Sequence, residues 1–280
     1  MSHFISAIHE AVRMSLTEDV GEGDITAALI PPEQGASATI MTRESAILCG
    51  VDWVNEVYHQ IDSSVIIRWK VNDGERIYPN QYLAELQGPA RSLLTGERCA
   101  LNWLQTLSGT ATTVDQYLRA VADTSVQLLD TRKTIPGLRY AQKYAVRCAG
   151  GKNHRMGLYD AYLIKENHIA TAGSIARVIQ QARHAQPGKT IEIEVQSLCE
   201  LQEALDASAD IVLLDNFNIE DIQTAVALNR GRVKLEVSGG VDLSQLRLLA
   251  KAGVDFISIG ALTKHVRAID LTLTLRCAPP

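Results

Sequence analysis

The segment IEIEVQSLCELQEALDASADIVLLDNF, residues 191–217, joins two short runs rich in Ile, Leu and Val through a stretch with the apolar spacing of a helix. Runs of this kind begin at residues 191, 211, 233 and 256, which are 20, 22 and 23 residues apart. Helical segments such as Leu198 to Ala207 lie between them. This regular alternation predicts parallel strands joined by helical crossovers.

Two earlier apolar runs extend the alternation toward the N-terminus. They cover residues 126–129 and 161–164 and bring the number of predicted strands to six. Six strands are too few to close a full α/β barrel. We therefore expect an incomplete, open α/β barrel over residues 111–266, and a doubly wound open sheet is the alternative.

Residues 1–110 have a different pattern of predicted elements, because strand-like runs follow one another without a helix between each pair. Apolar spacing predicts a helix over residues 4–16, and another is expected over residues 91–121 with an interruption at Gly109. The strand-like runs cover residues 38–48, 65–71 and 82–86. These features predict a separate N-terminal α+β unit.

The composition is that of an ordinary globular protein. Of the 280 residues, 46% are hydrophobic and 21% are charged, and the net charge is -5. No apolar stretch is long enough to cross a bilayer, and we expect no signal peptide at the start of the chain. The five cysteines are scattered, which argues against a disulfide framework or a zinc site and favours a cytoplasmic protein: Cys49, Cys99, Cys148, Cys199 and Cys277.

Positive charge is concentrated in one window, from Arg132 to His168. Eight Lys or Arg residues lie there against two acids, Asp160 and Glu166, so the window carries +6 and the rest of the chain -11. A basic field within an acidic protein attracts small anions, whereas net acidity argues against nucleic acid as a partner. Charge alone leaves open the alternative of a solvated basic helix face.

Polar or glycine-containing segments follow each of the six predicted strands. Both candidate architectures place ligands at the carboxyl ends of their strands. A Lys or Asp after a strand is commonly only a loop residue, but six successive polar strand ends favour a functional site. The segments are Asp130–Thr134, Lys165–His168, Glu194, Asp215–Asn216, Ser238–Gly240 and Gly260–Ala261.

The residue types at these ends indicate three tasks. Glycine turns after the last two strands allow backbone N–H groups to approach a phosphate. Glu194 and Asp215 have the carboxylates that hold Mg²⁺ or ribose hydroxyls. An excess of cations indicates a ligand with several negative charges, and Arg binds planar carboxylates through two hydrogen bonds. These cations are Arg132, Lys133, His154, Arg155 and Lys165.

Arg98 stands out in the predicted long helix. It lies four residues after Leu94 and three before Leu101, so spacing places it on the apolar face of the helix. An unpaired cation there is costly. The side chain either reaches the surface or pairs internally, or it is presented at an interface, for example into another subunit's site.

Taken together, these segments resemble the quinolinate phosphoribosyltransferase family nearly end to end. The most specific match pairs DTRKTIPGLR, residues 130–139, with KNHRMGLYDAYLIKENH, residues 152–168. Other matching segments are EDVGEGDIT at 18–26, GER at 96–98, GGKNHR at 150–155, Glu194, LDNF at 214–217, EVSGG at 236–240 and GALT at 260–263.

The resemblance implies an N-terminal α/β sandwich over residues 1–110, to which residues 267–280 return, followed by the open barrel. It implies homodimers or higher assemblies of dimers. Quinolinate would be bound by Arg98 of a neighbouring subunit together with Thr131, Arg132, His154, Arg155 and Lys165. The phosphoribosyl and phosphate groups would contact Lys133, Glu194, Asp215, Ser238, Gly239, Gly240, Ile259, Gly260 and Ala261.

The implied reaction joins N1 of quinolinate to C1 of phosphoribosyl pyrophosphate and then releases CO2, as a step of de novo NAD biosynthesis. Lys133, Lys165, Glu194 and Asp215 would be the catalytic residues. Mg²⁺ would be held, directly or indirectly, at Glu194 and Asp215, without an organic cofactor. Two departures from the family pattern are Gln196, where many relatives have an acid, and the Thr263-Lys264-His265 segment, whose Lys264 and His265 receive no role.

Three alternatives stay open at this point. The protein could be a paralogous phosphoribosyltransferase with another base specificity. It could be a Schiff-base aldolase, because a Lys at the end of a barrel strand such as Lys165 supports that chemistry. It could also be a non-catalytic anion-binding or regulatory module.

Overall fold

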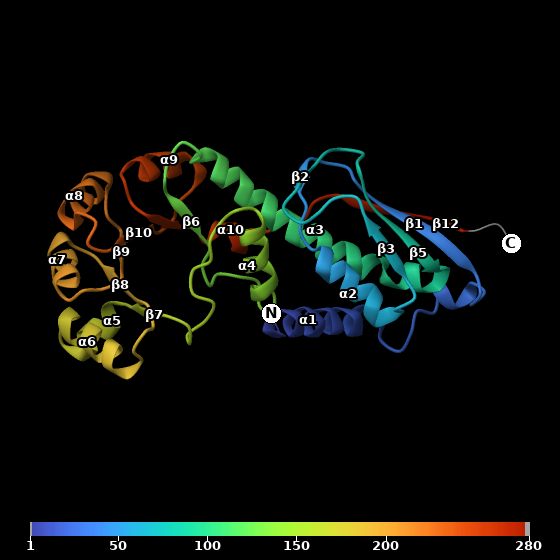
Figure 1. Cartoon of the computed structure of the whole chain (residues 1–280), viewed down its shortest axis with the longest axis horizontal. Helices are drawn as coiled ribbons and strands as arrows, with labels where there is room; N and C mark the ends of the chain where they lie inside the picture. The colour runs from blue at the N-terminus through green and yellow to red at the C-terminus, as the bar shows by residue number, and fades with distance from the viewer. Residues whose placement is uncertain (1, 278–280) are drawn as a thin grey trace. The chain divides into compact units, whose positions relative to one another are not determined.

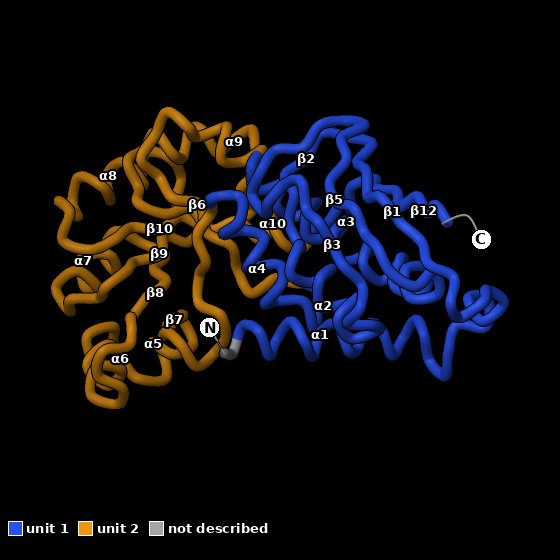
Figure 2. The backbone as a smooth tube through the Cα atoms, turned by 45° about the vertical axis from the view of Figure 1, so that its right-hand side comes forward, with its two compact units in different colours: residues 1–115, 135–150, 265–280 blue, residues 116–134, 151–264 orange. Residues whose placement is uncertain are grey.

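Residues 2–277, which the computed structural model describes, divide into two units that each combine distant parts of the chain (Figures 1 and 2). One unit contains residues 1–115, 135–150 and 265–280, and the other contains residues 116–134 and 151–264. No helix among the described residues is both long and apolar enough to cross a membrane.

The first unit is built on a four-stranded antiparallel sheet. Its strand order is β12-β1-β5-β3, with β1 (Gly35–Thr42) and β5 (Tyr82–Pro89) in the centre. The edge strands are β3 (Ile66–Trp69) and β12 (Leu271–Cys277), the latter pairing antiparallel with β1. A separate two-stranded sheet is formed by β2 (Ala46–Ile47) and β4 (Arg76–Ile77).

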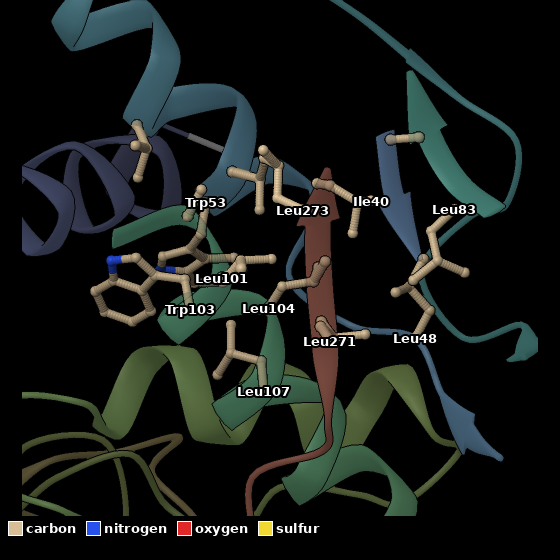
Figure 3. Close-up of a cluster of buried hydrophobic side chains, with 14 of the residues drawn as sticks. Ile40, Leu48, Trp53, Leu83, Leu101, Trp103, Leu104, Leu107, Leu271 and Leu273 are labelled. Carbon is tan, nitrogen blue, oxygen red and sulfur yellow. The ribbon is translucent and has the colours of Figure 1, made fainter. Parts of the chain in front are cut away.

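Helices cover this sheet and complete a hydrophobic core. They are α1 (Ser2–Val20), α2 (Val51–Ile61), α4 (Arg139–Cys148), the short 3₁₀ helix η1 (Ala27–Leu29) and most of α3 (Ala90–Ala120). Trp53, Leu101 and Leu104 from the helices belong to one buried cluster with Ile40 and Leu273 of the strands (Figure 3). Burial of these apolar side chains supplies the main stabilising free energy of the unit.

The predicted interruption of the long helix at Gly109 is wrong. The helix α3 runs unbroken from Ala90 to Ala120. The reason for a glycine lies in packing, because a Cβ at this position would lie 2.1 Å from the carbonyl oxygen of Arg267. Gly109 therefore permits a close approach of the backbone that leads into β12.

The second unit contains the six parallel strands that the spacing predicts. They are β6 (Gln127–Leu129), β7 (Tyr162–Ile164), β8 (Ile191–Val195), β9 (Ile211–Asp215), β10 (Lys234–Ser238) and β11 (Phe256–Ser258). The helices that follow the strands β7 to β11 are α5 (Glu166–Ala172), α6 (Ile175–Ala185), α7 (Leu198–Asp206), α8 (Ile219–Asn229), α9 (Leu243–Lys251) and α10 (Ala261–Lys264).

The strand order decides between the two predicted architectures. The order is β6-β11-β10-β9-β8-β7, so the first strand pairs with the last and the others follow in sequence. A doubly wound sheet would instead reverse its direction of winding at a switch point. The fold is thus an incomplete barrel that is open between β6 and β7, and α6, α7 and α8 lie along the outer side of its strands (Figure 1).

Candidate active site

The strand ends of the second unit bring the predicted acids and Lys165 together. Asp215 and Ser238, the last residues of β9 and β10, are register partners. Glu194 pairs with Leu213 on β9, and Ile164, the last residue of β7, pairs with Ile193 on β8. Adjacent parallel strands therefore carry these groups to one edge of the sheet, as expected for a barrel site.

Lys165 and Glu194 form the central ion pair of this edge. The Nζ atom of Lys165 donates to Oε2 of Glu194 at 2.5 Å. The Lys165 side chain is 48% exposed, whereas that of Glu194 is 13% exposed. The ammonium group is thus held at the strand ends while it stays accessible to a ligand.

Asp215 adds a second carboxylate beside this pair. Burial, the negative charge of Glu194 and that of Glu166 raise the pKa of the Asp215 carboxyl, although Lys165 opposes the shift. Gln196 also lies close, and a hydrogen bond from its side chain lowers the pKa of Asp215. The like charge of two neighbouring carboxylates favours binding of a cation between them, and oxygen ligands of this kind suit Mg²⁺.

Three cations line a hollow next to this edge. The hollow has a volume of about 610 Å³, and Arg132, Arg155, Lys165 and His168 contribute to its lining. Burial and the positive charge of Arg132 lower the pKa of the Arg155 guanidinium. Because the two guanidinium groups repel each other, an anionic ligand between them is favoured.

Lys133 and the last glycine turn are packed against each other. A Cβ at Gly260 would lie 2.9 Å from Cδ of Lys133 and 3.7 Å from Oγ1 of Thr131. The backbone N–H of Lys133 donates to Oγ1 of Thr131 at 3.0 Å, and the Thr263 hydroxyl donates to the carbonyl oxygen of Lys133 at 2.8 Å. The Lys133 segment is thereby held against the turn at Gly260, the residue of this turn that has no side chain.

The glycine turn after β10 has backbone angles that favour glycine. Gly239 has φ 103° and Gly240 has φ 56°, and a Cβ at either would meet no atom within 4 Å. The turn therefore offers open space next to its backbone. Ser238, Ile259 and Ala261 occupy the neighbouring positions at the ends of β10 and β11.

His154 is held by three acids that the sequence reading did not assign. Its backbone N–H donates to Oδ1 of buried Asp130 at 2.9 Å, and Asp130 also accepts from the Asn153 side chain. Its Nε2 lies 2.8 Å from Oε2 of Glu192 and 3.7 Å from Oε1 of Glu236. The sequence has a glutamate two residues before Glu194 and another two residues before Ser238, within otherwise apolar strands, but this spacing does not show that either side chain is buried.

Arg98 lies in the first unit and not among the strand ends. It belongs to α3, and its side chain is exposed although Cys99, Ala100 and Leu101 beside it are buried. The side chain therefore does not lie buried on the apolar face of the helix. The side chain is available at the surface of its unit.

Comparisons with known proteins agree along the whole chain. Residues 24–108 match the family model "Quinolinate phosphoribosyl transferase, N-terminal domain", and residues 110–274 match its C-terminal domain. A probable nicotinate-nucleotide pyrophosphorylase [carboxylating] from Bacillus subtilis is 40% identical and covers 91% of this chain and 89% of its own length. The Mycobacterium leprae enzyme is also 40% identical, with 96% and 97% covered.

A solved structure agrees in fold as well as in sequence. The nicotinate-nucleotide pyrophosphorylase from Francisella tularensis superposes with a TM-score of 0.94 at 51% identity, and 97% of each chain is covered. The two family models together span both units, and the curated relatives match over nearly their full length. The chain belongs to the quinolinate phosphoribosyltransferase family.

Proposed function

We propose that the strand ends of the second unit transfer the phosphoribosyl group of phosphoribosyl pyrophosphate to N1 of quinolinate. The 2-carboxylate then leaves as CO2, and the products are nicotinate mononucleotide and pyrophosphate, as in de novo NAD biosynthesis. The observation that carries this proposal is the pair of guanidinium groups, Arg132 and Arg155, beside the Lys165–Glu194 ion pair and Asp215. Cationic side chains that can bind a dicarboxylate thus lie next to acidic side chains that can bind a sugar and its metal ion.

Quinolinate occupies the cationic part of this site. Arg132, Arg155 and Lys165 neutralise its two carboxylates, with Thr131 and His154 in the same loops. Its pyridine nitrogen already has a free lone pair, so the attack on C1 of the sugar requires no general base. The protein contributes mainly orientation and charge.

The phosphoribosyl donor occupies the acidic and glycine-rich part. Ser238, Gly239 and Gly240, together with Ile259, Gly260 and Ala261, bind phosphate through backbone N–H groups, and Lys133 contacts the donor beside Gly260. Glu194 and Asp215 stabilise the positive charge that develops at C1 as pyrophosphate leaves. Mg²⁺, when bound at these carboxylates, draws negative charge away from the pyrophosphate.

Decarboxylation follows from the charge on the new nucleotide. When the bond from C2 to the carboxylate breaks, its electron pair stays on C2 next to the positively charged nitrogen. A proton then replaces the carboxylate. Lys165 exchanges its bond to Glu194 for the substrate, which links the quinolinate side of the site to the sugar side.

The active assembly is a homodimer or a higher assembly of dimers, in which Arg98 reaches the site of a neighbouring subunit. The exposure of this cation, in the unit that does not hold the strand ends, supports the proposal. The five cysteines are free thiols, which supports a reducing compartment and hence the cytoplasm.

One assay tests this function. Purified protein with quinolinate, phosphoribosyl pyrophosphate and Mg²⁺ should release CO2 and form nicotinate mononucleotide in equal amounts. Nicotinate in place of quinolinate is the control, because it has no 2-carboxylate to lose and lacks one of the two anions. Turnover of nicotinate without turnover of quinolinate would instead indicate a paralogue of other base specificity.

A further inference from the structure

Two glutamates lie inside the strand layer of the second unit, where apolar residues are the rule. Glu192 on β8 is 3% exposed and Glu236 on β10 is 0% exposed. Within the described chain, Oε1 of Glu192 and both carboxylate oxygens of Glu236 have no hydrogen-bond partner. Buried carboxylate oxygens without hydrogen bonds are costly, so the presence of these two side chains calls for a role.

Burial disfavours the presence of two negative charges on Glu192 and Glu236. Burial and the negative charge of Glu192 raise the pKa of Glu236 to about 7. The groups that face Glu236 are Glu192 from β8, His154 from the loop before β7 and the Ser258 hydroxyl from β11. Burial and the neighbouring carboxylate therefore favour the protonated form of Glu236 up to near neutral pH.

The hydrogen bonds of His154 fix where its ring proton lies. The backbone N–H of Arg155 donates to Nδ1 of His154 at 2.8 Å, and an N–H group can only donate. The Nδ1 atom is therefore unprotonated, and the ring proton lies on Nε2, which donates to Oε2 of Glu192 at 2.8 Å. Both ring nitrogens are thus committed within the protein.

The same three side chains also form a possible ligand set for a divalent metal. His154, Glu192 and Glu236 each offer a ligand atom, and these atoms lie within 4.8 Å of one another. A histidine that binds a metal through one nitrogen normally donates the N–H of the other. Here Nδ1 accepts a hydrogen bond, so a metal on Nε2 would require a fully deprotonated ring. The geometry favours a proton over a metal ion.

We infer that Glu192 and Glu236 are positioning residues for the dicarboxylate site, acting through His154 on Arg155. Glu192 accepts a hydrogen bond from Nε2–H of His154 at 2.8 Å, and Glu236 lies 3.7 Å from the same nitrogen. The Nδ1 atom of the ring accepts a hydrogen bond from the backbone N–H of Arg155. The guanidinium of Arg155 is meanwhile oriented by the carbonyl oxygen of Ala161 at 3.4 Å. This inference rests on the proposed role of Arg155 in binding quinolinate.

The kinetic test compares Glu236→Gln with Glu236→Leu. The glutamine keeps the size and the hydrogen-bonding capacity of a protonated glutamate, so it should keep the KM for quinolinate within about twofold at neutral pH. The leucine removes the polar group, and the KM for quinolinate should rise about tenfold or more while the KM for phosphoribosyl pyrophosphate stays unchanged. Glu203→Gln, the same loss of charge on the exposed face of α7, is the matched control.

A pH series separates positioning from a merely structural role. The KM of the unmodified enzyme for quinolinate should rise between about pH 6 and about pH 9, as Glu236 loses its proton near pH 7. The Glu236→Gln variant should show no such rise. An equal rise in both proteins would overturn the inference, as would an unchanged KM for quinolinate in a folded Glu236→Leu protein.

A spectroscopic readout is independent of activity. In ¹⁵N spectra of histidine-labelled protein, assigned by comparison with His154→Gln, the His154 ring should show the pattern of the Nε2–H tautomer. A charged ring, an Nδ1–H tautomer, or signals that change on addition of Mn²⁺ and recover with a chelator would contradict the proton-sharing arrangement. If Arg155→Ala leaves quinolinate binding intact, the proposed site fails instead, and the tautomer result still stands on its own.

Discussion

Arg155 shows how a binding residue is prepared before its ligand arrives. Its guanidinium is partly removed from water and lies close enough to Arg132 for the like charge to lower its pKa. Its backbone and its side chain are each held by a hydrogen bond, to His154 and to Ala161. The repulsion between the two cations is thus an unfavourable free energy that is already present in the folded protein. Binding of a dianion removes it.

We predict that Arg155→Ala mainly weakens quinolinate binding. The loss should be about 2–5 kcal/mol, as for removal of one member of a desolvated charge pair. Titration calorimetry with quinolinate measures it directly. Arg177→Ala, an exposed arginine on α6, is the control and should bind normally. Unchanged affinity in the Arg155→Ala protein would contradict its assignment to the dicarboxylate.

Glu236 predicts a pH dependence of stability. Its pKa in the folded protein is raised to about 7 from an ordinary 4.5. The stability that Glu236 contributes is therefore fully present below pH 4.5 and is lost as the pH rises through about 7. Glu236→Gln should flatten this loss, by on the order of 1–3 kcal/mol between acidic and alkaline pH. Urea unfolding at several pH values measures it, and parallel curves for the two proteins would exclude the effect.

At the scale of elements, the spacing of apolar runs predicted all six parallel strands of the second unit to within about two residues of their ends. The predicted interruption at Gly109 was wrong because a glycine in a helical sequence can mark either a break in the helix or a close contact with another segment. Only the position of the neighbouring backbone distinguishes these two cases. The strand β12 (Leu271–Cys277) was not found by this spacing, because it pairs with β1 far away in the chain.

The close contact of Gly109 gives a prediction for α3. Alanine has a higher helix propensity by about 1 kcal/mol, but its Cβ would overlap the carbonyl oxygen of Arg267 at 2.1 Å. Overpacking should prevail, and Gly109→Ala should destabilise the protein by about 1–3 kcal/mol. Thermal unfolding compares it with Asn102→Ala, an exposed position on the same helix. A stabilised Gly109→Ala protein would contradict the close approach.

The turn after β11 gives a second prediction at this scale. In Gly260→Ala the new Cβ would lie 2.9 Å from Cδ of Lys133, a flexible side chain that can move aside. We expect little change in stability and a KM for phosphoribosyl pyrophosphate that rises about tenfold, the equivalent of one disturbed charged contact. Gly35→Ala, where a Cβ meets no atom within 4 Å, is the control. An equal rise in the KM for quinolinate would contradict a specific role of this turn in binding phosphoribosyl pyrophosphate.

At the scale of the whole molecule, the sequence predicted which strand-end side chains lie together, because parallel strands gather their carboxyl ends at one edge of a sheet. Lys165, Glu194 and Asp215 follow from that rule alone. The roles of these side chains stay predictions. The buried pair Glu192 and Glu236 could not be predicted, because alternation in a strand does not show which face lies inward or which loop covers it. Arg98 belongs to the other unit, so no rule about strand ends applies to it.

Sharing of sites between subunits predicts complementation. Arg98→Ala and Lys165→Ala proteins should each be inactive, because each lacks one cation of the proposed quinolinate site. After subunit exchange under random pairing, about half of the dimers are mixed and one of the two sites in each regains both residues, so the mixture should recover about a quarter of the normal activity per site. Exchange is verified with differently tagged subunits. Exchange without any recovered activity would rule out a shared site.

The pairing of β12 with β1 has a consequence for synthesis on the ribosome. The residues of the second unit end at Lys264, before β12 emerges, whereas the sheet of the first unit lacks an edge strand until Leu271–Cys277 has been made. Until then, the backbone groups along one side of β1 have no intramolecular partner and can recruit strands from other nascent chains. Chaperone demand during translation should therefore concentrate on the first unit, even though most of it is synthesised first.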